Sequence, residues 1–340
     1  MRAAIQAIEF YLPESTLTTQ QLAREFPDWS VEKIDKKTGV SVRHIAAPGE
    51  CSSDLAVRAA EKLFASEVCE RSEIDFILFC TQSPDYLLPT TACLIQDRLG
   101  LKTSVGALDF NLGCSGYVYG LALAKGLIET GQARTVLLLT AETYSKFINP
   151  TNRSVRTIFG DAGAATLLRG IDDVGTEPLG PFLFGTDGRG GENLIVKSGG
   201  LRQPLDESLS AGQPGRHCLF MNGPEIFAFT LQTVPSVVRQ LLAKAQCERD
   251  EVDLYVFHQA NRYMLESLRN AIRIKPEAFV NEMSETGNTV SSTIPIALKQ
   301  AEEAGRLRDG ARVMLVGFGV GYSWSGCVLQ WTRARETKNA

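Results

Sequence analysis

Short apolar runs alternate with longer amphipathic stretches along the whole chain. Four apolar runs have the length of buried strands and lie at residues 76–79, 136–140, 254–257 and 313–316. Four stretches between them follow the helical period and lie at residues 54–64, 115–130, 225–245 and 292–304. Strands of this length separated by helices predict an α/β protein with buried sheets. The segment 178–218 is rich in Gly, Pro, Asp and Ser, and it predicts a long loop over a surface or a binding cleft.

The chain repeats itself at one fixed offset. The segment EIDFILF at 73–79 resembles EVDLYVF at 251–257, and 251 − 73 is 178. The dipeptide Ala-Arg precedes an apolar run at 133–134 and again at 311–312, and 312 − 134 is also 178. Two independent matches at one offset predict two copies of one α/β unit, related by a pseudo-two-fold axis. A site at the junction of such halves draws residues from both.

Length and charge limit the classes of function. The 340 residues allow two domains, which we place at 1–170 and 171–340. The chain holds 35 Lys+Arg against 39 Asp+Glu, a net charge of −4 without a basic block, so we expect no nucleic-acid partner. We also expect no membrane span, because no run of about 18 apolar residues exists. The N-terminus lacks the pattern of a signal peptide, which predicts a cytoplasmic protein.

Cysteine and histidine usage narrows the candidate chemistry further. The cysteines stand at positions 51, 69, 80, 93, 114, 218, 247 and 327. No pair has the C-x-x-C spacing and only 3 histidines are present, so we expect no metal site. Without a secretory signal, the cysteines are expected to be reduced thiols, most of them small apolar filler.

One cysteine stands in an unusual context. An apolar, strand-like run ends in Gly113-Cys114-Ser115-Gly116, and a helical pattern begins directly after it. A thiol at a helix start feels the positive end of the helix dipole, which lowers its pKa and favours the nucleophilic thiolate. The flanking glycines permit a tight backbone turn. A buried structural cysteine in a Gly-rich turn fits the same residues equally well.

Three segments of the second half contain further candidates. His258 ends an apolar strand, where a hydrogen-bonded structural histidine is commoner than a catalyst, but the first copy has Cys80 in its place. Asn288 follows a glycine just before a predicted helix and by itself resembles an N-cap. The glycines of 317–326 lack a following helix and a downstream acidic residue, which excludes a dinucleotide loop. A turn between two strands, with backbone N–H groups open to a ligand oxygen, fits that segment instead.

In combination, these motifs resemble the ketoacyl-acyl-carrier-protein synthase III family of the thiolase superfamily. The resemblance is carried by GCSGYVYG (113–120), HQAN (258–261), GNTVSSTIP (287–295) and GFGVGYSW (317–324). Segments 36–50, 88–100 and 158–168 extend it over essentially the whole chain. It implies a thiolase-like α/β fold with two duplicated halves in five layers (α-β-α-β-α), in agreement with the internal repeat.

The resemblance also implies a catalytic set of Cys114, His258 and Asn288. Cys114 would take an acyl group from a thioester and form a covalent acyl-enzyme. His258 and Asn288 would bind the thioester carbonyl of the second substrate and stabilise the enolate formed on decarboxylation. The backbone N–H groups of Cys114 and Val320 would form the other oxyanion hole.

The substrate-binding positions depart from the family pattern. Where well-known members hold the adenine and phosphates of coenzyme A with a Trp and an Arg, this chain has Lys33 and Lys37, and Trp29 lies four residues early. Arg153 and Asn261 keep the other adenine-side and pantetheine-side positions. The resemblance therefore implies coenzyme A or phosphopantetheine thioesters as substrates, without a cofactor, and the departure favours a carrier-protein-bound donor. The lysines could also face an acidic acyl carrier protein.

The same resemblance places three apolar side chains along the acyl pocket: Leu88 of a partner subunit, Phe159 and Phe318. Leu88 replaces a bulkier aromatic residue of short-chain members, which favours a longer or branched acyl chain. We predict a cytosolic, homodimeric acyltransferase of fatty acid biosynthesis. It would acylate Cys114 and then perform a decarboxylative Claisen condensation with malonyl-carrier protein, giving a 3-oxoacyl product.

Two alternatives stay open at this point. A secondary-metabolism relative would make quinolones, resorcinols or head-to-head ketones, or transfer the acyl group to an oxygen or nitrogen nucleophile; the departures at Lys33 and Tyr263 motivate it. A non-catalytic carrier-protein-binding scaffold is the alternative of another class. A cysteine hydrolase is disfavoured, because Asn288 supplies no carboxylate to activate water.

Overall fold

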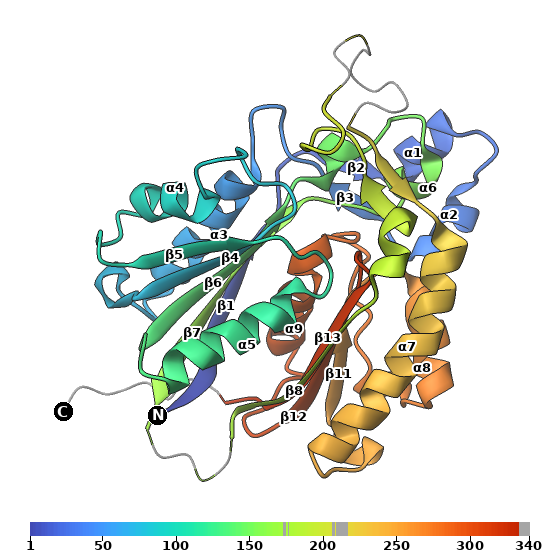
Figure 1. Cartoon of the computed structure of the whole chain (residues 1–340). Coiled ribbons are helices and arrows are strands. Elements are labelled where there is room, and N and C mark those ends of the chain that lie inside the picture. The colour runs from blue at the N-terminus through green and yellow to red at the C-terminus, as the bar shows by residue number, and fades with distance from the viewer. Residues whose placement is uncertain (173–174, 176, 206–207, 209–216, 333–340) are drawn as a thin grey trace.

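The computed structural model describes residues 1–172, 175, 177–205, 208 and 217–332, and two mixed β-sheets form its framework (Figure 1). The first sheet has the order β1-β7-β6-β4-β5. Its strands are β1 (Arg2–Tyr11), β7 (Ala162–Ile171), β6 (Thr135–Glu142), β4 (Phe76–Cys80) and β5 (Gly106–Phe110). The second sheet has the order β11-β12-β13-β8. Its strands are β11 (Leu254–Phe257), β12 (Arg312–Gly319), β13 (Ser323–Gln330) and β8 (Leu179–Thr186).

Helices form three layers around these two sheets (Figure 1). On the outer face of the first sheet lie α3 (Ser52–Ala65) and α4 (Thr91–Arg98). Between the sheets lie α5 (Gly116–Glu129) and α9 (Thr293–Glu303), each in contact with strands of both. Covering the second sheet are α7 (Gly223–Lys244) and α8 (Arg262–Ile272). The predicted α/β fold in five layers is therefore confirmed.

The internal repeat extends to individual hydrogen bonds. The strand series β4-β6-β7-β1 and β11-β12-β13-β8 share one pattern, with a parallel first pair and antiparallel pairs after it. Asp75 accepts the backbone N–H of Arg134 at 2.8 Å, and Asp253 accepts that of Arg312 at the same distance. Each aspartate follows a 3-10 helix, η1 (Arg71–Glu73) or η4 (Arg249–Glu251), that starts with a reciprocal capping box. The offset of 178 thus reflects a repeated structural unit.

The segment 178–218 is not one long loop, as its composition predicted. Its first part forms β8, which pairs with β13, then the 3-10 helix η3 (Gly188–Asn193) and the short strand β9 (Leu194–Val196). Gly180, Pro181 and Gly185 make the stretch resemble a loop, yet an edge strand tolerates a proline because one side of its backbone pairs with no neighbour. The rest of this prediction falls partly on residues 206–207 and 209–216, outside the described residues.

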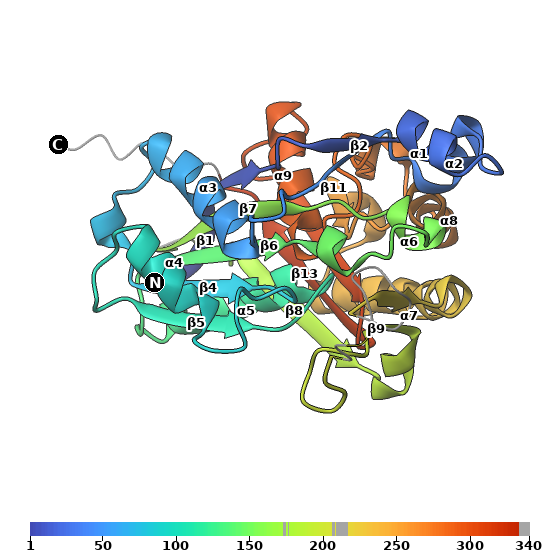
Figure 2. The ribbon, with the colours of Figure 1, turned by 90° about the horizontal axis from the view of Figure 1, so that it is seen from above.

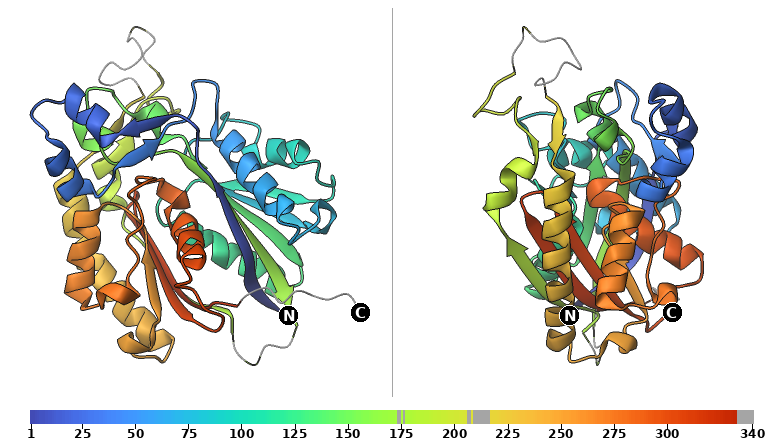
Figure 3. Two further views of the ribbon diagram at one scale, coloured as in Figure 1. Left: turned by 180° about the vertical axis from the view of Figure 1, so that it is seen from behind. Right: turned by 90° about the vertical axis from the view of Figure 1, so that its right-hand side faces the viewer.

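A third group of small elements gathers at one end of the molecule (Figure 3). The strands β2 (Thr16–Thr18) and β3 (Val42–His44) pair antiparallel, as do β9 and β10 (Leu219–Met221). Near them lie α1 (Thr19–Glu25), α2 (Val31–Thr38) and the single turn α6 (Arg153–Arg156). The remaining 3-10 turns are η2 (Tyr144–Phe147), η5 (Pro276–Ala278) and η6 (Val290–Ser292).

The sequence predicted no apolar segment long enough to span a membrane, and helix α7 is an exception to that prediction. Among the described helices it alone is long and apolar enough, by length and composition, to cross a membrane. It contacts β12, β13 and β8 and buries Val234, Val237, Val238 and Leu241 in the core of the second half. Its apolar residues thus cover one face of the second sheet.

Candidate active site

Cys114 lies at a strand-to-helix elbow, as the sequence predicted. It directly precedes Ser115, the N-cap of α5. The second half holds this elbow in place, because the Ser325 hydroxyl donates to the Ser115 carbonyl at 2.9 Å. A Cβ at Gly319, at the end of β12, would lie 2.9 Å from the Cys114 Sγ. The glycine at 319 therefore lets β12 approach the thiol directly.

The thiol is less acidic than the sequence predicted. Burial, followed by the nearby Glu142 carboxyl, raises the pKa of Cys114 to about 12. The backbone N–H groups of Val320 and of Cys114 itself lie at the sulfur and act in the opposite direction. The start of α5 favours the thiolate, but removal from water outweighs it. Cys114 therefore rests as a neutral thiol, with the two predicted oxyanion-hole N–H groups beside it.

His258 and Asn288 face each other beside this elbow. The Nδ2 of Asn288 lies 3.5 Å from the Nε2 of His258, and both side chains are buried. Asn288 is not the N-cap that its sequence context suggested, because α9 starts only at Thr293. Instead its Oδ1 accepts the backbone N–H of Val290 at 2.9 Å, which turns the amide N–H₂ group toward the histidine. The fold thus brings Cys114, His258 and Asn288 to one end of β12, where Phe318 contacts the His258 ring.

Burial also sets the charge of His258. It lowers the pKa of the imidazole to about 3, so the ring is neutral at physiological pH. The Nδ1 lies 2.7 Å from the Thr293 hydroxyl. That hydroxyl carries one proton and also lies 3.0 Å from the Val290 carbonyl oxygen. When the proton points to Nδ1, the ring proton resides on Nε2 and faces Asn288. Two N–H donors then face each other with no oxygen between them, and a substrate carbonyl oxygen would satisfy both.

A buried carboxyl that the sequence did not reveal lies behind the thiol. Glu142 ends β6, and its oxygens accept the Gln82 backbone N–H at 3.0 Å and the hydroxyls of Ser83 at 3.1 Å and Ser291 at 2.9 Å. Burial raises the pKa of Glu142 to about 8, and these hydrogen bonds oppose the shift. In the sequence it is one acidic residue after an apolar strand, a position that usually faces solvent.

Two of the predicted coenzyme A positions, Lys37 and Arg153, lie beside the Trp29 ring. The Lys37 Nζ lies 5.1 Å from the centroid of the Trp29 ring, and the Arg153 guanidinium carbon lies 5.4 Å from it. Trp29 lies four residues before Lys33 in the sequence, and the fold brings its ring beside Lys37 and Arg153. Asn261 caps α8, and its Oδ1 accepts the Met264 backbone N–H at 2.9 Å.

The predicted acyl-pocket residues fall into two groups. Phe159 shares an apolar cluster with Cys114, Tyr144, Leu194, Leu219 and Val290, and its backbone bridges to that of Asn288. Phe318 is buried against the His258 ring at a centroid distance of 5.5 Å. Leu88 is 81% exposed and is not a member of the cluster around Cys114 in its own chain.

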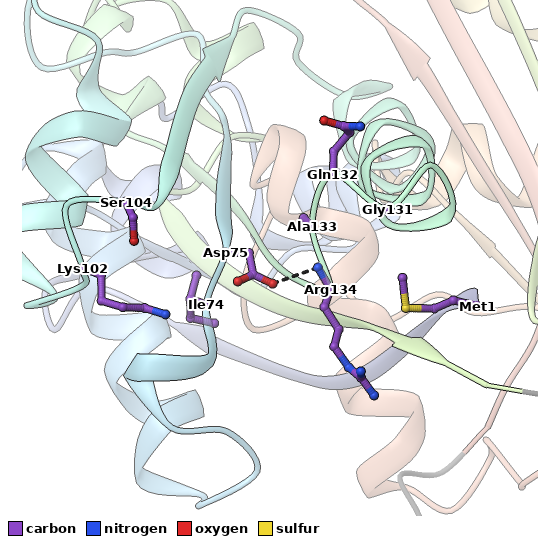
Figure 4. Close-up of a pocket in the computed structure, with 9 residues that line it drawn as sticks. All are labelled: Met1, Ile74, Asp75, Lys102, Ser104, Gly131, Gln132, Ala133 and Arg134. Atoms are coloured by element: carbon purple, nitrogen blue, oxygen red, sulfur yellow. Dashed lines mark hydrogen bonds between the residues drawn. The ribbon is translucent and has the colours of Figure 1, made fainter.

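A separate hollow of about 360 Å³ lies at the opposite ends of the first sheet's strands. Figure 4 shows Asp75, Lys102, Ser104 and Arg134 around it, with Asp75 accepting the backbone N–H of Arg134. None of the predicted site residues lines this hollow. Among the residues that the structure describes, no group of three His, Cys, Asp or Glu could hold a metal ion.

Comparison with known families identifies relatives of both halves. Residues 108–188 match the family described as 3-oxoacyl-[acyl-carrier-protein (ACP)] synthase III. Residues 242–331 match the C-terminal part of the same synthase. The two matches include Cys114, His258 and Asn288.

Whole proteins similar to this chain bear matching descriptions. The beta-ketoacyl-[acyl-carrier-protein] synthase III of Caldanaerobacter subterraneus is 34% identical and covers 97% of this chain and 98% of its own. A crystal structure of a 3-oxoacyl-(acyl-carrier-protein) synthase III has 51% identity and a TM-score of 0.94, with coverage of 97% and 100%. The 3-oxoacyl-(acyl-carrier protein) synthase of Burkholderia xenovorans LB400 has 37% identity and a TM-score of 0.89, with coverage of 98% and 95%.

The neutral histidine gives a spectroscopic prediction. Because burial holds the pKa of His258 near 3, its two ring nitrogens should keep the shifts of a neutral imidazole from pH 8 down to about pH 5. A hydrogen bond from the Thr293 hydroxyl to Nδ1 should keep the proton on Nε2. Long-range ¹H–¹⁵N correlation on ring-labelled protein measures both, and His258→Ala assigns the signals. Thr293→Val should change the Nδ1 shift most, because it removes the hydroxyl beside that atom. An imidazolium at pH 6, or a proton on Nδ1, would contradict this protonation state.

Proposed function

The chain belongs to the 3-oxoacyl-[acyl-carrier-protein] synthase III family of condensing enzymes, and from this premise we propose that it joins an acyl group to a malonyl-derived unit in two steps. The observation that carries the proposal is the convergence of the Cys114 elbow with the His258–Asn288 pair at one end of β12. A nucleophile and two neutral N–H donors are the groups that these two steps require.

In the first step, Cys114 acts as an acyltransferase nucleophile. Its sulfur attacks the carbonyl of an acyl thioester, the thiol proton passes to the departing thiol, and a covalent acyl-enzyme remains. This exchange needs no net proton, which suits a thiol that rests neutral. The N–H groups of Cys114 and Val320 beside the sulfur support the oxyanion that forms on the acyl oxygen.

In the second step, the neutral pair acts on a malonyl thioester. The malonyl carboxylate leaves as CO₂, and its electron pair becomes an enolate whose oxygen accepts hydrogen bonds from Asn288 Nδ2 and His258 Nε2. The enolate carbon attacks the acyl carbonyl, and the Cys114 sulfur leaves and takes up one proton. The product is a 3-oxoacyl thioester. A neutral imidazole suits this role, since it stabilises the enolate without protonating it early.

We further propose that coenzyme A thioesters are accepted as acyl donors, beside carrier-protein thioesters. Trp29 offers an aromatic surface for an adenine, and Lys37 and Arg153 bring two cations to it for the phosphates. The malonyl unit would arrive on acyl carrier protein. The reaction draws its chemistry from these substrates, so the proposal includes no resident cofactor.

A homodimer is proposed from an unpaired sheet edge. β5 is the outer strand of the first sheet, and its Leu108 is 44% exposed. Figure 2 places β5, α5 and β8 along one side of the molecule, where Leu123 and Phe184 are also exposed. Pairing of two β5 edges would cover these side chains. It would also place the exposed Leu88 of one subunit near the acyl pocket of the other.

The alternative functions gain no support from these observations. The three relatives named above, between 34% and 51% identical to this chain, are described as beta-ketoacyl- or 3-oxoacyl-carrier-protein synthases. Those descriptions mention neither secondary metabolism nor a scaffold. The assembled Cys–His–Asn site argues against a scaffold in the same way. A cytoplasmic location stays a prediction from the N-terminal sequence.

Single substitutions should block acylation and condensation separately. With an acyl thioester donor, Cys114→Ser should lose the acyl adduct in intact-protein mass spectrometry, while His258→Ala and Asn288→Ala should still form it. The latter two should lose condensation by about 100-fold or more, since each lacks one enolate donor. Cys93→Ser, at an exposed cysteine, is the matched control. An adduct that persists in Cys114→Ser, or malonyl decarboxylation that survives in both other variants, would contradict the assignment.

Donor recognition is tested by removing the aromatic ring of Trp29. Trp29→Ala should raise the KM for an acyl-coenzyme A about tenfold, the effect of losing one stacking or cation–π contact. The KM for the matching acyl-pantetheine, which lacks the adenine and its phosphates, should stay unchanged. Equal losses for both donors would place the coenzyme A nucleotide elsewhere.

The dimer is tested by charging the β5 edge. Leu108→Lys should shift the mass measured by light scattering from two chains to one. Leu201→Lys is the matched control, because Leu201 is 95% exposed and lies outside the strands of the first sheet. A monomeric wild-type protein, or a dimer that persists in Leu108→Lys, would contradict the proposed interface.

A further inference from the structure

The short turn η6 and the start of α9 touch both members of the His–Asn pair. The Val290 backbone N–H holds the Oδ1 of Asn288 at 2.9 Å. The Thr293 hydroxyl lies 2.7 Å from the Nδ1 of His258 and 3.0 Å from the Val290 carbonyl oxygen. A shift of this turn would therefore displace both side chains that act on the malonyl unit.

The backbone of this turn needs support from outside. Val290 has a φ of 56°, in the left-handed region that β-branched residues rarely adopt. Such a conformation is strained and persists only where the surroundings hold it. Val290 is fully buried in the apolar cluster around Cys114, so solvent cannot satisfy the polar groups of the turn.

The support comes from the other half of the chain. The Ser291 hydroxyl donates to Glu142 Oε1 at 2.9 Å, and the Ser292 hydroxyl donates to the Thr140 carbonyl at 3.1 Å. Both acceptors lie at the end of β6. Glu142 is anchored in turn by the Gln82 N–H and the Ser83 hydroxyl at the end of β4. All three partners donate, so an acceptor with two oxygens fits this place.

We propose that Glu142 and Ser291 form a positioning pair that holds the His258–Asn288 dyad for the decarboxylation step. This inference rests on the two-step function proposed above. Within the described part of the chain, no hydrogen bond joins either residue to the Cys114 sulfur or to the side-chain nitrogens of the dyad, so each acts through the turn. The pair belongs to the second step and leaves the first step intact.

The Glu142 carboxyl ionises above its pKa of about 8, and in that pH range its charge provides a second, opposite readout. The ionisable groups that interact with its carboxyl are Cys80, Cys114, Tyr144 and Asp161. The carboxyl contributes to the raised pKa of Cys114, so Glu142→Gln should lower that pKa. The same variant should therefore make the thiol react at lower pH while it slows condensation. A loss of fold would instead weaken both.

The experiment separates the two steps in Glu142→Gln, Ser291→Ala and the double variant. Each protein is first acylated by an acyl thioester, and the acyl-enzyme is then mixed with a malonyl thioester. Each single variant should form the acyl-enzyme at the wild-type rate or faster and condense about tenfold more slowly, the effect of one buried hydrogen bond whose partner is left unsatisfied. The double variant should lose little more than either single one, because both substitutions weaken the same support of the turn.

A control substitution and an alkylation assay distinguish a positioning effect from misfolding and from failure of the proposed function. Thr230→Val removes a buried hydroxyl in α7 and should change neither step. Alkylation of Cys114 by iodoacetamide, followed across pH by peptide mass spectrometry, should shift to lower pH in Glu142→Gln and stay unchanged in Ser291→Ala. If Glu142→Gln fails to fold, the acylation and condensation rates of Ser291→Ala alone show which step is affected.

Several outcomes would overturn the positioning pair. Unchanged condensation in Ser291→Ala would do so, as would parallel losses in acylation and condensation, or a double variant slowed about 100-fold, the product of two independent tenfold losses. A wild-type protein that forms no acyl-enzyme or does not condense would instead refute the proposed function itself.

Discussion

The close approach of the two halves at the Cys114 elbow is the constraint on which the rest of the site depends. Each half sends a strand end to the helix start of the other. β12 brings Gly319 and Val320 to Cys114 before α5, and β6 brings Glu142 to Ser291 before α9. Glu142 and Val320 occupy equivalent positions of the internal repeat, since 142 + 178 is 320. The repeat therefore relates the two contacts. In the proposed mechanism, one of these pseudo-symmetric contacts serves as the oxyanion hole and the other as a buried support.

Burial governs the chemistry of this junction more than local dipoles do. Removal from water makes both the thiol and the imidazole neutral at rest, although the thiol lies at a helix start. A neutral thiol suits an exchange between thioesters, and a neutral imidazole suits hydrogen bonding to an enolate. The same exclusion of water strengthens each hydrogen bond offered to a developing charge.

Periodicity and repeats predicted the architecture because they follow from contacts within each unit. The strand at 76–79 is observed as Phe76–Cys80, and the helix at 115–130 as Gly116–Glu129. Long-range effects were not visible in the sequence. The edge strand β8 resembled a loop because of its glycines and proline, and the pKa of Cys114 depends on burial by distant residues. Glu142 gave no signal at all, because its partners come from two other segments.

A single-turnover chase tests the central claim, that a thiol from one half and a neutral pair from the other serve successive steps of one reaction. Wild-type acyl-enzyme is separated from unreacted acyl thioester, mixed with malonyl-carrier protein, and quenched at intervals for intact-mass analysis. We expect the acyl mass on Cys114 to disappear as one CO₂ and one 3-oxoacyl thioester form per site. Release of the free acid, or decarboxylation while the acyl mass persists, would contradict this claim.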